Sequence, residues 1–413
     1  MGKAVRRRML AILAVTQIAS WGSLYYGIAI LGPAIAAEMG WRNELVYGAY
    51  SWSLVLSGLA ASPAGALLDR IGGRKVMGAG SVLAAIGMLL LGLSHSLWLY
   101  FLAWSVLGFA MAATLYEAAF AAINREFGLE ARKLISNLTL FGGFASTVFW
   151  PLTLQLDGLL GWRNTCLAYA AMHLLLCLPL HLLLPAGPGH VHHAASAAPG
   201  QGSQGDFSLQ EALAHPSFWQ LAIAFAINSL IFSGLAVHLI PLLKGFGHAD
   251  TMAVALAALI GPAQVAGRIA ERVFFHAAPP EHIGRFAFAA LPFGLLALLC
   301  LSASMSAAAL FCLLLGASNG ILTIVRGTVP QALYGRTHYG AIAGAMASPT
   351  LGARAAGPLL LAALLGAHTP AGGLLAACLG LAVLSLLLYL SAARRSVLQA
   401  GRRRAMMDPS SGD

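Results

Sequence analysis

Charged residues inside long apolar runs are the features of this sequence that point most directly to chemistry. Arg354 lies in one such run and Glu117 in another. A charge at the centre of a bilayer costs roughly 2.5–3.5 kcal/mol on insertion scales, so it is kept where it faces water, a partner or a ligand. A guanidinium there can bind an organic anion, and a carboxyl group can load and release a proton. We therefore expect an anion site at Arg354 and proton coupling at Glu117.

Each of these charges also has a structural explanation. Arg268 could lie near a helix end, with its charged head reaching the interface, or it could pair with Glu271. Glu117 could be the static partner of a helix-end base such as Arg125. Arg354 could belong to an internal ion pair. Because the apolar runs hold few acids, we expect the ligand to bring the missing negative charge.

Polar side chains at helical spacing supply further candidates for substrate binding. Three residues at four-residue spacing share one face of the first apolar run: Gln17, Trp21 and Tyr25. Their large polar-tipped rings could line a cavity or simply pack between helices. Asn228 and Asn319 are candidates to orient the body of a substrate. Arg326 shares a helical face with Asn319, although it could serve topology alone.

Membrane helices are the elements that must position these residues. The 413-residue chain is 59% hydrophobic and 9% charged, whereas soluble domains carry about 25% charged residues. A crossing helix needs about 20 apolar residues, and helices satisfy their own backbone in lipid. We therefore predict an all-α membrane protein with twelve transmembrane helices in two pseudo-symmetric six-helix bundles. The predicted spans are 10–37, 45–68, 76–94, 98–123, 134–157, 164–184, 214–243, 250–275, 284–302, 306–329, 339–367 and 371–393.

Charge in the loops predicts the orientation. Most Lys and Arg residues fall in alternate loops, whereas only Arg42, Arg163 and Lys244 lie in the others. By the positive-inside rule, both termini are cytoplasmic, and we expect a multi-pass protein of the bacterial inner (cytoplasmic) membrane. The basic start leads into a run too long for a cleaved signal peptide. The net charge of +10 is thus a topology signal and does not indicate nucleic-acid binding.

A break rich in Gly, Ala, Pro and Ser divides the chain. We predict an N-terminal bundle at 1–184, a cytoplasmic linker at 185–213, a C-terminal bundle at 214–393 and a cytoplasmic tail at 394–413. The linker contains His190, His192 and His193, which could suggest a metal but are typical of a solvated loop. An internal echo supports the division, because the pattern Gly-x-x-x-acid-Arg precedes both the third and the ninth predicted helix.

Constellations typical of catalysis are missing from the sequence. The five cysteines all fall in apolar runs without metal-binding spacing. There is no Ser/His/Asp set and no phosphate-cradling Gly loop. We therefore expect no enzyme activity, no metal and no cofactor, with a proton gradient as the energy source. The expected partners are a small organic anion, protons and the lipid bilayer, and the chain is expected to act as a monomer.

The loop between the second and third predicted helices resembles a family signature. It reads Gly65-Ala-Leu-Leu-Asp69-Arg70-Ile-Gly72-Gly-Arg74-Lys75 and is similar to the cytoplasmic signature loop of the major facilitator superfamily. The resemblance covers essentially the whole chain and implies two six-helix bundles that alternate access. It also implies that the acid and the bases form a charge-paired latch between helix ends. The expected latch residues are Gly65, Asp69, Arg70, Gly72, Arg74 and Lys75.

Comparison within that family favours anion transport. Its drug exporters usually carry an Arg four residues before a Gly in helix four, where this chain has Trp104 before Gly108. Residues 127–143 resemble the start of helix five in monocarboxylate and oxalate porters. The oxalate-type porters also carry cations in helices eleven and eight, which Arg354 and Arg268 match.

We therefore expect a secondary active transporter that moves a small, monocarboxylate-like organic anion, coupled to protons, by alternating access. The first alternative is a proton-antiport efflux pump for drugs or metabolites that uses Glu117. The second is a membrane receptor or scaffold that moves no solute.

Overall fold

Helices make up the part of the chain that the structure describes. A computed structural model gives residues 3–185, 207–275, 278–366 and 371–407. Most of the predicted linker, with His190, His192 and His193, lies outside these residues. In chain order the elements are α1 (Lys3–Ser20), η1 (Trp21–Tyr26), α2 (Ile28–Met39), α3 (Asn43–Ile71), α4 (Gly73–Gly92), α5 (Leu97–Thr114), α6 (Tyr116–Phe127), η2 (Gly128–Glu130), α7 (Ala131–Gly142), α8 (Ala145–Met172), η3 (His173–Cys177), α9 (Leu178–Leu182), α11 (Leu209–Ala214), α12 (Pro216–Gly245), α13 (Asp250–Ala258), α14 (Ile260–Phe274), α15 (Pro280–Cys300), α16 (Met305–Tyr334), α17 (Tyr339–Gly366) and α18 (Ala371–Met407).

Ten helical stretches of the described residues are long and apolar enough to cross a membrane. One of them, Ala131–Leu182, is 52 residues long and is interrupted at Gly161, where φ is 75°. It therefore holds two crossings, at the predicted spans 134–157 and 164–184. Counted in this way and together with α17, which is 28 residues long, the stretches give the twelve predicted helices. The prediction of an all-α membrane protein is confirmed.

Large apolar side chains cover the outside of these helices. Leu159, Leu175 and Phe274 are 81%, 78% and 76% exposed, respectively. Extended surfaces of this kind are rare on soluble monomers, where they mark interfaces or aggregation sites. In hydrocarbon they are the required surface, because only apolar side chains face lipid without cost. The chain is a multi-pass membrane protein.

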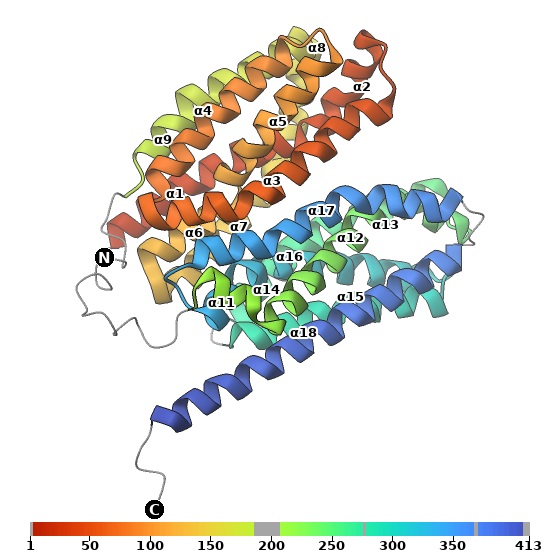
Figure 1. Cartoon of the computed structure of the whole chain (residues 1–413). Coiled ribbons are helices and arrows are strands. Elements are labelled where there is room, and N and C mark those ends of the chain that lie inside the picture. Colours follow the sequence, from red (N-terminus) through yellow and green to blue (C-terminus); the bar gives the residue numbers. More distant parts are fainter. Residues whose placement is uncertain (1–2, 186–206, 276–277, 367–370, 408–413) are drawn as a thin grey trace, which may run out of the picture. The chain divides into compact units, whose positions relative to one another are not determined.

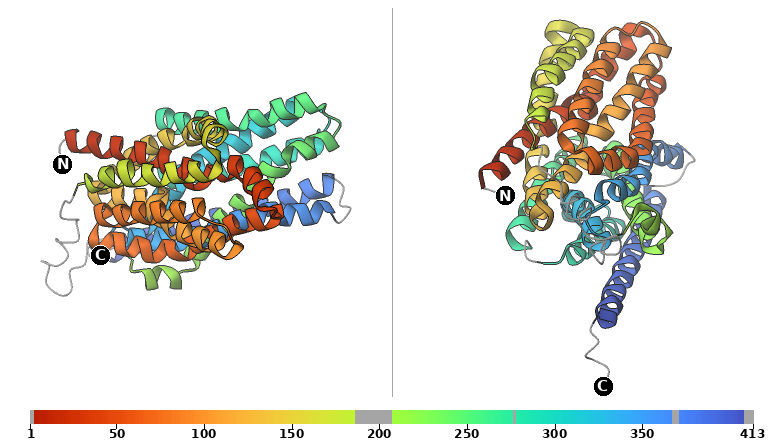
Figure 2. Two further views of the ribbon diagram at one scale, coloured as in Figure 1. Left: turned by 90° about the horizontal axis from the view of Figure 1, so that it is seen from above. Right: turned by 60° about the vertical axis from the view of Figure 1, so that its left-hand side comes forward.

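Contacts group the chain into two compact units, each with its own core. Unit 1 comprises Met1–Ser208 with Tyr334–Ala355, and unit 2 comprises Leu209–Leu333 with Ala356–Asp413. In unit 1, α4 packs on α5 and α8, and α3 packs on α5 (Figures 1 and 2). In unit 2, α18 packs along α12 and α15. Helix α17 is thus shared, and its first part, as far as Ala355, belongs to unit 1.

Several helices depart from the regular spans that the sequence predicts. The predicted span 10–37 contains a π-helical turn, η1, between α1 and α2. The predicted span 98–123 is interrupted at Leu115, where φ is −81° and ψ is −166°. Helix α18 continues as far as Met407, past the predicted end of its span at 393, and extends beyond the helices on which it packs (Figure 1). The first two interruptions shape the candidate site.

Candidate functional site

Arg354 lies near the middle of α17 and faces the ring of Tyr25. Its guanidinium carbon is 5.7 Å from the ring centroid, which is a cation–π distance. The side chain is half-buried. Among the described residues, Arg354 forms no ion pair. The internal ion pair considered as an alternative is therefore not made there, and the guanidinium keeps donors for another acid.

An aromatic cluster surrounds this contact in unit 1. Its members are Trp21, Tyr25, Tyr26, Tyr50, Trp104 and Tyr116. The Tyr25 ring centroid lies 4.9 Å from that of Trp21 and 5.7 Å from that of Tyr50. Tyr50 in turn lies 5.4 Å from Trp104, the residue at the exporter Arg position. Offset and edge-on rings at such distances pack favourably, so the cluster is a packed set of rings beside the Arg354 guanidinium.

The π-helical turn η1 explains why both neighbouring tyrosines join the cluster. In an α-helix, Trp21 would meet Tyr25 four residues on and point away from Tyr26. The wider π turn follows an i to i+5 pattern, and here Trp21 lies within 6.2 Å of the Tyr26 ring as well. The sequence placed Gln17, Trp21 and Tyr25 on one helical face but did not include Tyr26.

Gln17 forms a hydrogen bond at the break between α5 and α6, in the predicted span 98–123. Its Nε2 donates to the Thr114 carbonyl at 2.6 Å, and its Oε1 accepts from Trp21 Nε1 at 3.2 Å. Helix α5 ends at Thr114, so that carbonyl lacks an intrahelical partner, and a buried carbonyl without one costs about 1–3 kcal/mol. In this structure the Gln17 amide therefore serves the protein by bridging two elements and orienting Trp21. Its predicted contact with substrate stays a prediction.

Glu117 lies in the first turn of α6, directly after the break. Its half-buried carboxylate acts electrostatically on Arg354 and on Tyr339. The N-terminus of a helix carries partial positive charge, which stabilises an anion there. Arg125 is not its partner, because the Arg125 guanidinium donates instead to the carbonyls of Leu68, at 3.0 Å, and Asp69. The alternative of a static Glu117–Arg125 pair is wrong.

The signature loop holds the start of α17, although by different bonds from those expected. Asp69 Oδ1 accepts from the backbone N–H of Gly340 and Oδ2 from that of Ala341, each at 3.1 Å. The carboxylate thus caps the positive end of a helix. Arg70, Arg74 and Lys75 are exposed, and Gly72 lies between α3 and α4. Within the described residues Asp69 forms no ion pair, so the expected charge pairing is replaced by capping of backbone N–H groups.

Gly65 lets α3 approach α17 at this latch, which gives a prediction for stability. A Cβ at Gly65 would overlap the carbonyl of Gly340. Gly65→Ala should therefore destabilise the protein by about 1–3 kcal/mol, the usual cost of overpacking. Gly48→Ala in the same helix is the matched control, since a Cβ there meets nothing within 4 Å. Thermal unfolding in detergent should show a lower midpoint for the first variant alone; equal midpoints for the two variants would contradict this contact.

The other predicted polar residues lie in unit 2. Asn228 is buried in α12, next to Ser229. Arg326 of α16 donates from Nη2 to Ser229 Oγ at 3.3 Å, and its guanidinium lies 5.8 Å from the Phe225 ring centroid. The backbone carbonyl of Asn319, seven residues before Arg326 in α16, accepts from the Thr323 hydroxyl at 2.9 Å. The Arg326–Ser229 bond thus joins α16 to α12. The roles of Asn228, Asn319 and Arg326 stay predictions.

Arg268 and Glu271 are buried together in α14. They are 5% and 1% exposed and stand three residues apart on one helix face. Gly267 lies against Ala317 of α16, where a Cβ would come within 2.9 Å of the carbonyl oxygen. Arg268 is therefore buried within unit 2, where α14 lies close to α16. Its predicted contact with the substrate stays a prediction.

A match to a family model shows which family this chain belongs to. Residues 10–358 match the model of the Major Facilitator Superfamily. The chain belongs to the major facilitator superfamily. Proteins of this superfamily are transporters, so the predictions of a transporter and of a non-enzyme are confirmed. The resemblance of the loop at Gly65–Lys75 pointed to the correct family.

Two individual proteins show how far the likeness extends. The chain is similar to monocarboxylate transporter 13 of Rattus norvegicus, with 29% identity over 211 residues, which are 51% of this chain and 47% of that protein. It thus spans about half the length of the curated relative it matches. It is also similar to the crystal structure of the human organic anion transporter MFSD10 (TETRAN), with a TM-score of 0.72 and 18% identity, over 94% of this chain and 100% of the other. At that identity the likeness shows the fold alone.

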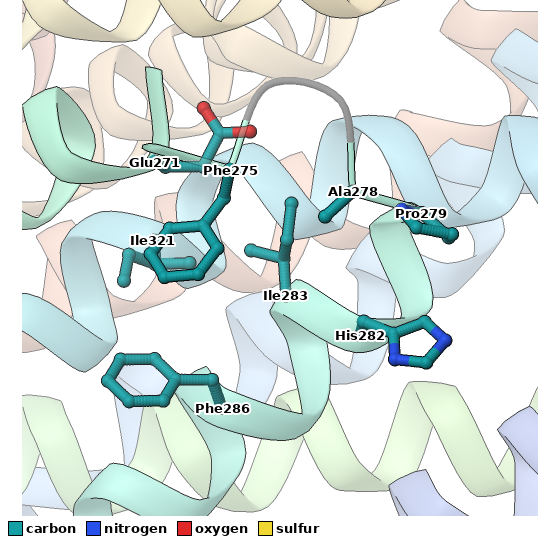
Figure 3. A pocket seen from close by; sticks show the side chains of 8 residues that line it. All are labelled: Glu271, Phe275, Ala278, Pro279, His282, Ile283, Phe286 and Ile321. Carbon is teal, nitrogen blue, oxygen red and sulfur yellow. The ribbon is translucent and has the colours of Figure 1, made fainter. Parts of the chain in front are cut away.

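Unit 2 of this superfamily member also contains a pocket of about 300 Å³. Figure 3 shows its lining, in which Phe275, Phe286, Ile283 and Ile321 supply apolar walls beside Glu271. The remaining lining residues are Ala278, Pro279 and His282. Among the residues that the structure describes, no arginine or lysine lines the pocket, whereas Arg354 lies beside the aromatic cluster. We therefore place the candidate anion site at Arg354 and the aromatic cluster.

Proposed function

We propose that this chain is a secondary active transporter for a small monocarboxylate, coupled to protons and working by alternating access. The observation that carries the proposal is the half-buried Arg354 guanidinium, which faces Tyr25 and forms no ion pair among the described residues. Arginine binds carboxylates through two parallel N–H bonds, and it remains charged throughout. The similarity to a monocarboxylate transporter over half of the chain supports the same substrate class.

The aromatic cluster suits the rest of such a substrate. Its rings present apolar faces next to the Arg354 guanidinium. The guanidinium can therefore bind the carboxylate of a small molecule while the rings contact its apolar body. Tyr25 contacts Arg354 directly, and its hydroxyl can add a hydrogen bond. Trp104, which packs against Tyr50 of this cluster, stands where the drug exporters usually carry an arginine. The arrangement favours an anion with an apolar body over a lipophilic cation.

Glu117 supports coupling to protons. Its negative charge acts on Arg354, so a bound carboxylate and the Glu117 carboxylate share one positive charge. Binding of the anion therefore favours uptake of a proton on Glu117, and by linkage the proton favours the anion. The result is symport without direct contact between the two ligands.

The remaining parts of the proposal concern the whole protein. Residues 1–184 and 214–393 would be its two six-helix bundles, joined by the linker 185–213. The protein would lie as a monomer in a bacterial inner membrane with both termini in the cytoplasm, because positive loop charges favour that side. By capping α17, Asp69 would stabilise either the inward-facing or the outward-facing state. A ligand shifts the equilibrium between these two states only as far as its affinities for them differ.

Uptake into proteoliposomes tests this function. Purified protein should accumulate labelled lactate or benzoate when the outside is acidic, and protein-free liposomes should show only passive entry of the acid. Neutral amides of the same acids should not be accumulated. Gradient-driven extrusion of a lipophilic cation, without acid uptake, would instead support the alternative of an efflux pump. If neither solute moved, the alternative of a receptor or scaffold would stand.

A further inference from the structure

The π-helical turn that presents Tyr25 is held by one buried hydrogen bond from another helix. Ser23, inside η1, has its Oγ 2.9 Å from His173 Nε2. The histidine begins η3, a second π-helical turn in the sixth span. Both side chains are buried, at 3% and 0% exposure. Two irregular turns in different spans thus meet at a single polar contact.

The direction of this bond follows from the serine. The Ser23 hydroxyl donates its proton to the Ala19 carbonyl at 2.8 Å. It has only one proton, so towards His173 it must accept. His173 therefore carries its proton on Nε2, and its Nδ1 has no hydrogen-bond partner. The neutral imidazole acts as a directional clamp on the π turn.

The same side of η1 is also fixed by shape. A Cβ at Gly22 would overlap the ring of Phe149 in α8, so the turn lies flush against that helix. Gly22 and Ser23 thus anchor η1 against Phe149 of the fifth span and His173 of the sixth. The residues on its other side, Trp21 and Tyr25, contact Tyr116 and Arg354. A shift of the anchored side would move the rings beside the guanidinium.

We propose that His173 is a positioning residue for the anion site: its Nε2–H bond to Ser23 fixes the π turn that places Tyr25 against Arg354. The proposal rests on the proposed function, because it gives His173 a role in anion affinity. His173 touches neither the anion nor Arg354. It acts through Ser23 and the backbone of η1.

The chain offers a matched control in a second histidine–serine pair. His181, eight residues after His173 in the same span, has its Nδ1 2.7 Å from Ser81 Oγ. Both residues are fully buried, and Ser81 also donates to a helical carbonyl, that of Met77. The chemistry is the same, but Ser81 lies in α4, which carries no ring of the aromatic cluster.

The test compares alanine variants of the two histidines in the full-length protein in proteoliposomes. His173→Ala should raise the KM for benzoate about tenfold while Vmax changes less than about twofold, the split expected when affinity alone is lost. His181→Ala should leave KM within about twofold, although both variants lose one buried hydrogen bond and should lower the unfolding midpoint similarly. Equal rises in KM for the two variants would overturn the proposal.

Conservative replacements sharpen the comparison. The amide nitrogen of glutamine lies near the position of His Nε2, so His173→Gln should restore KM to within about twofold of the wild type. His173→Asn, whose amide is too short for that position, should resemble His173→Ala. If asparagine restored KM as well as glutamine, a specific bond to Ser23 would be excluded.

A second readout does not depend on transport. Hydrogen–deuterium exchange should become faster in peptides covering 17–30 for His173→Ala and stay unchanged there for His181→Ala, because only the first loses the clamp on η1. If wild-type protein moved no monocarboxylate, this difference would still show the positioning of η1 while the proposed function failed. Unchanged exchange at 17–30, in a protein that transports benzoate, would refute the positioning role alone.

Discussion

Replacing Arg354 with glutamine should abolish accumulation of monocarboxylates. The substitution removes the guanidinium that faces Tyr25 of the aromatic cluster. Loss of one partner of a buried, hydrogen-bonded charge pair costs about 2–5 kcal/mol, and even 2 kcal/mol weakens binding about thirtyfold. Uptake assays measure accumulation, and substrate-dependent thermal stabilisation in detergent measures binding. Arg354→Lys should retain part of the affinity, because it keeps the charge but loses the two-pronged geometry.

An exposed arginine provides the control for this result. Arg42 is 80% exposed and pairs with Glu44 at the surface, where such a pair contributes little. Arg42→Gln should therefore transport normally. Wild-type kinetics in Arg354→Gln would remove the basis for an anion site at that position, leaving only the superfamily fold.

Replacing Glu117 with glutamine should separate exchange from accumulation. The amide keeps the size of the side chain but cannot carry a proton, so a pH gradient should no longer drive uptake. Exchange of labelled for unlabelled substrate across the membrane should continue at a rate within about tenfold of the wild type, since Arg354 remains. The measurement compares counterflow with gradient-driven uptake in the same proteoliposomes.

Glu126 is the control for this variant because it lies in the same helix, α6, and is also half-buried. Glu126→Gln should retain gradient-driven uptake. If Glu117→Gln still accumulated substrate against a gradient, the proton would have to bind elsewhere, and Glu117 would be left with only an electrostatic effect on Arg354.

The helices could be predicted from the sequence because the bilayer imposes their length. Runs of about 20 apolar residues mark crossings wherever they fall, and even the crossing pair inside Ala131–Leu182 was separated correctly at the loop containing Gly161. The interruptions inside helices were not predictable in this way. Neither Leu115 nor the turn at Trp21–Tyr26 has a proline that would mark it.

Those interruptions depend on contacts between segments far apart in the chain. The break at Leu115 is stabilised by Gln17, which lies 97 residues before Thr114, and η1 is held by His173, which lies 150 residues after Ser23. Local patterns cannot reveal such partners. For the same reason, the helical face of Gln17 did not predict that its amide bridges two elements of the protein, and its contact with substrate stays a prediction.

The site itself was predicted in part. Arg354, Trp21 and Tyr25 come together in unit 1, as expected from a charge in an apolar run and from an aromatic face. Tyr50 and Tyr116 were not included, because a single aromatic residue on a long apolar helix carries no pattern that separates a cavity wall from ordinary packing. Asn228, Asn319 and Arg268 lie in unit 2 and stay predictions.

Helix α17 carries both the capped turn at Gly340 and the guanidinium at Arg354. Fourteen residues separate them, which is about 21 Å along a helix axis at 1.5 Å per residue. Because both positions lie on one helix, a movement of its start can reach Arg354 along the backbone, without a chain of side chains between them. Thermodynamic reciprocity then requires that, if anion binding loosens the Asp69 cap, loosening the cap must strengthen anion binding by the same factor. The Asp69 carboxylate, although remote from the substrate, would thereby help to set the affinity for it.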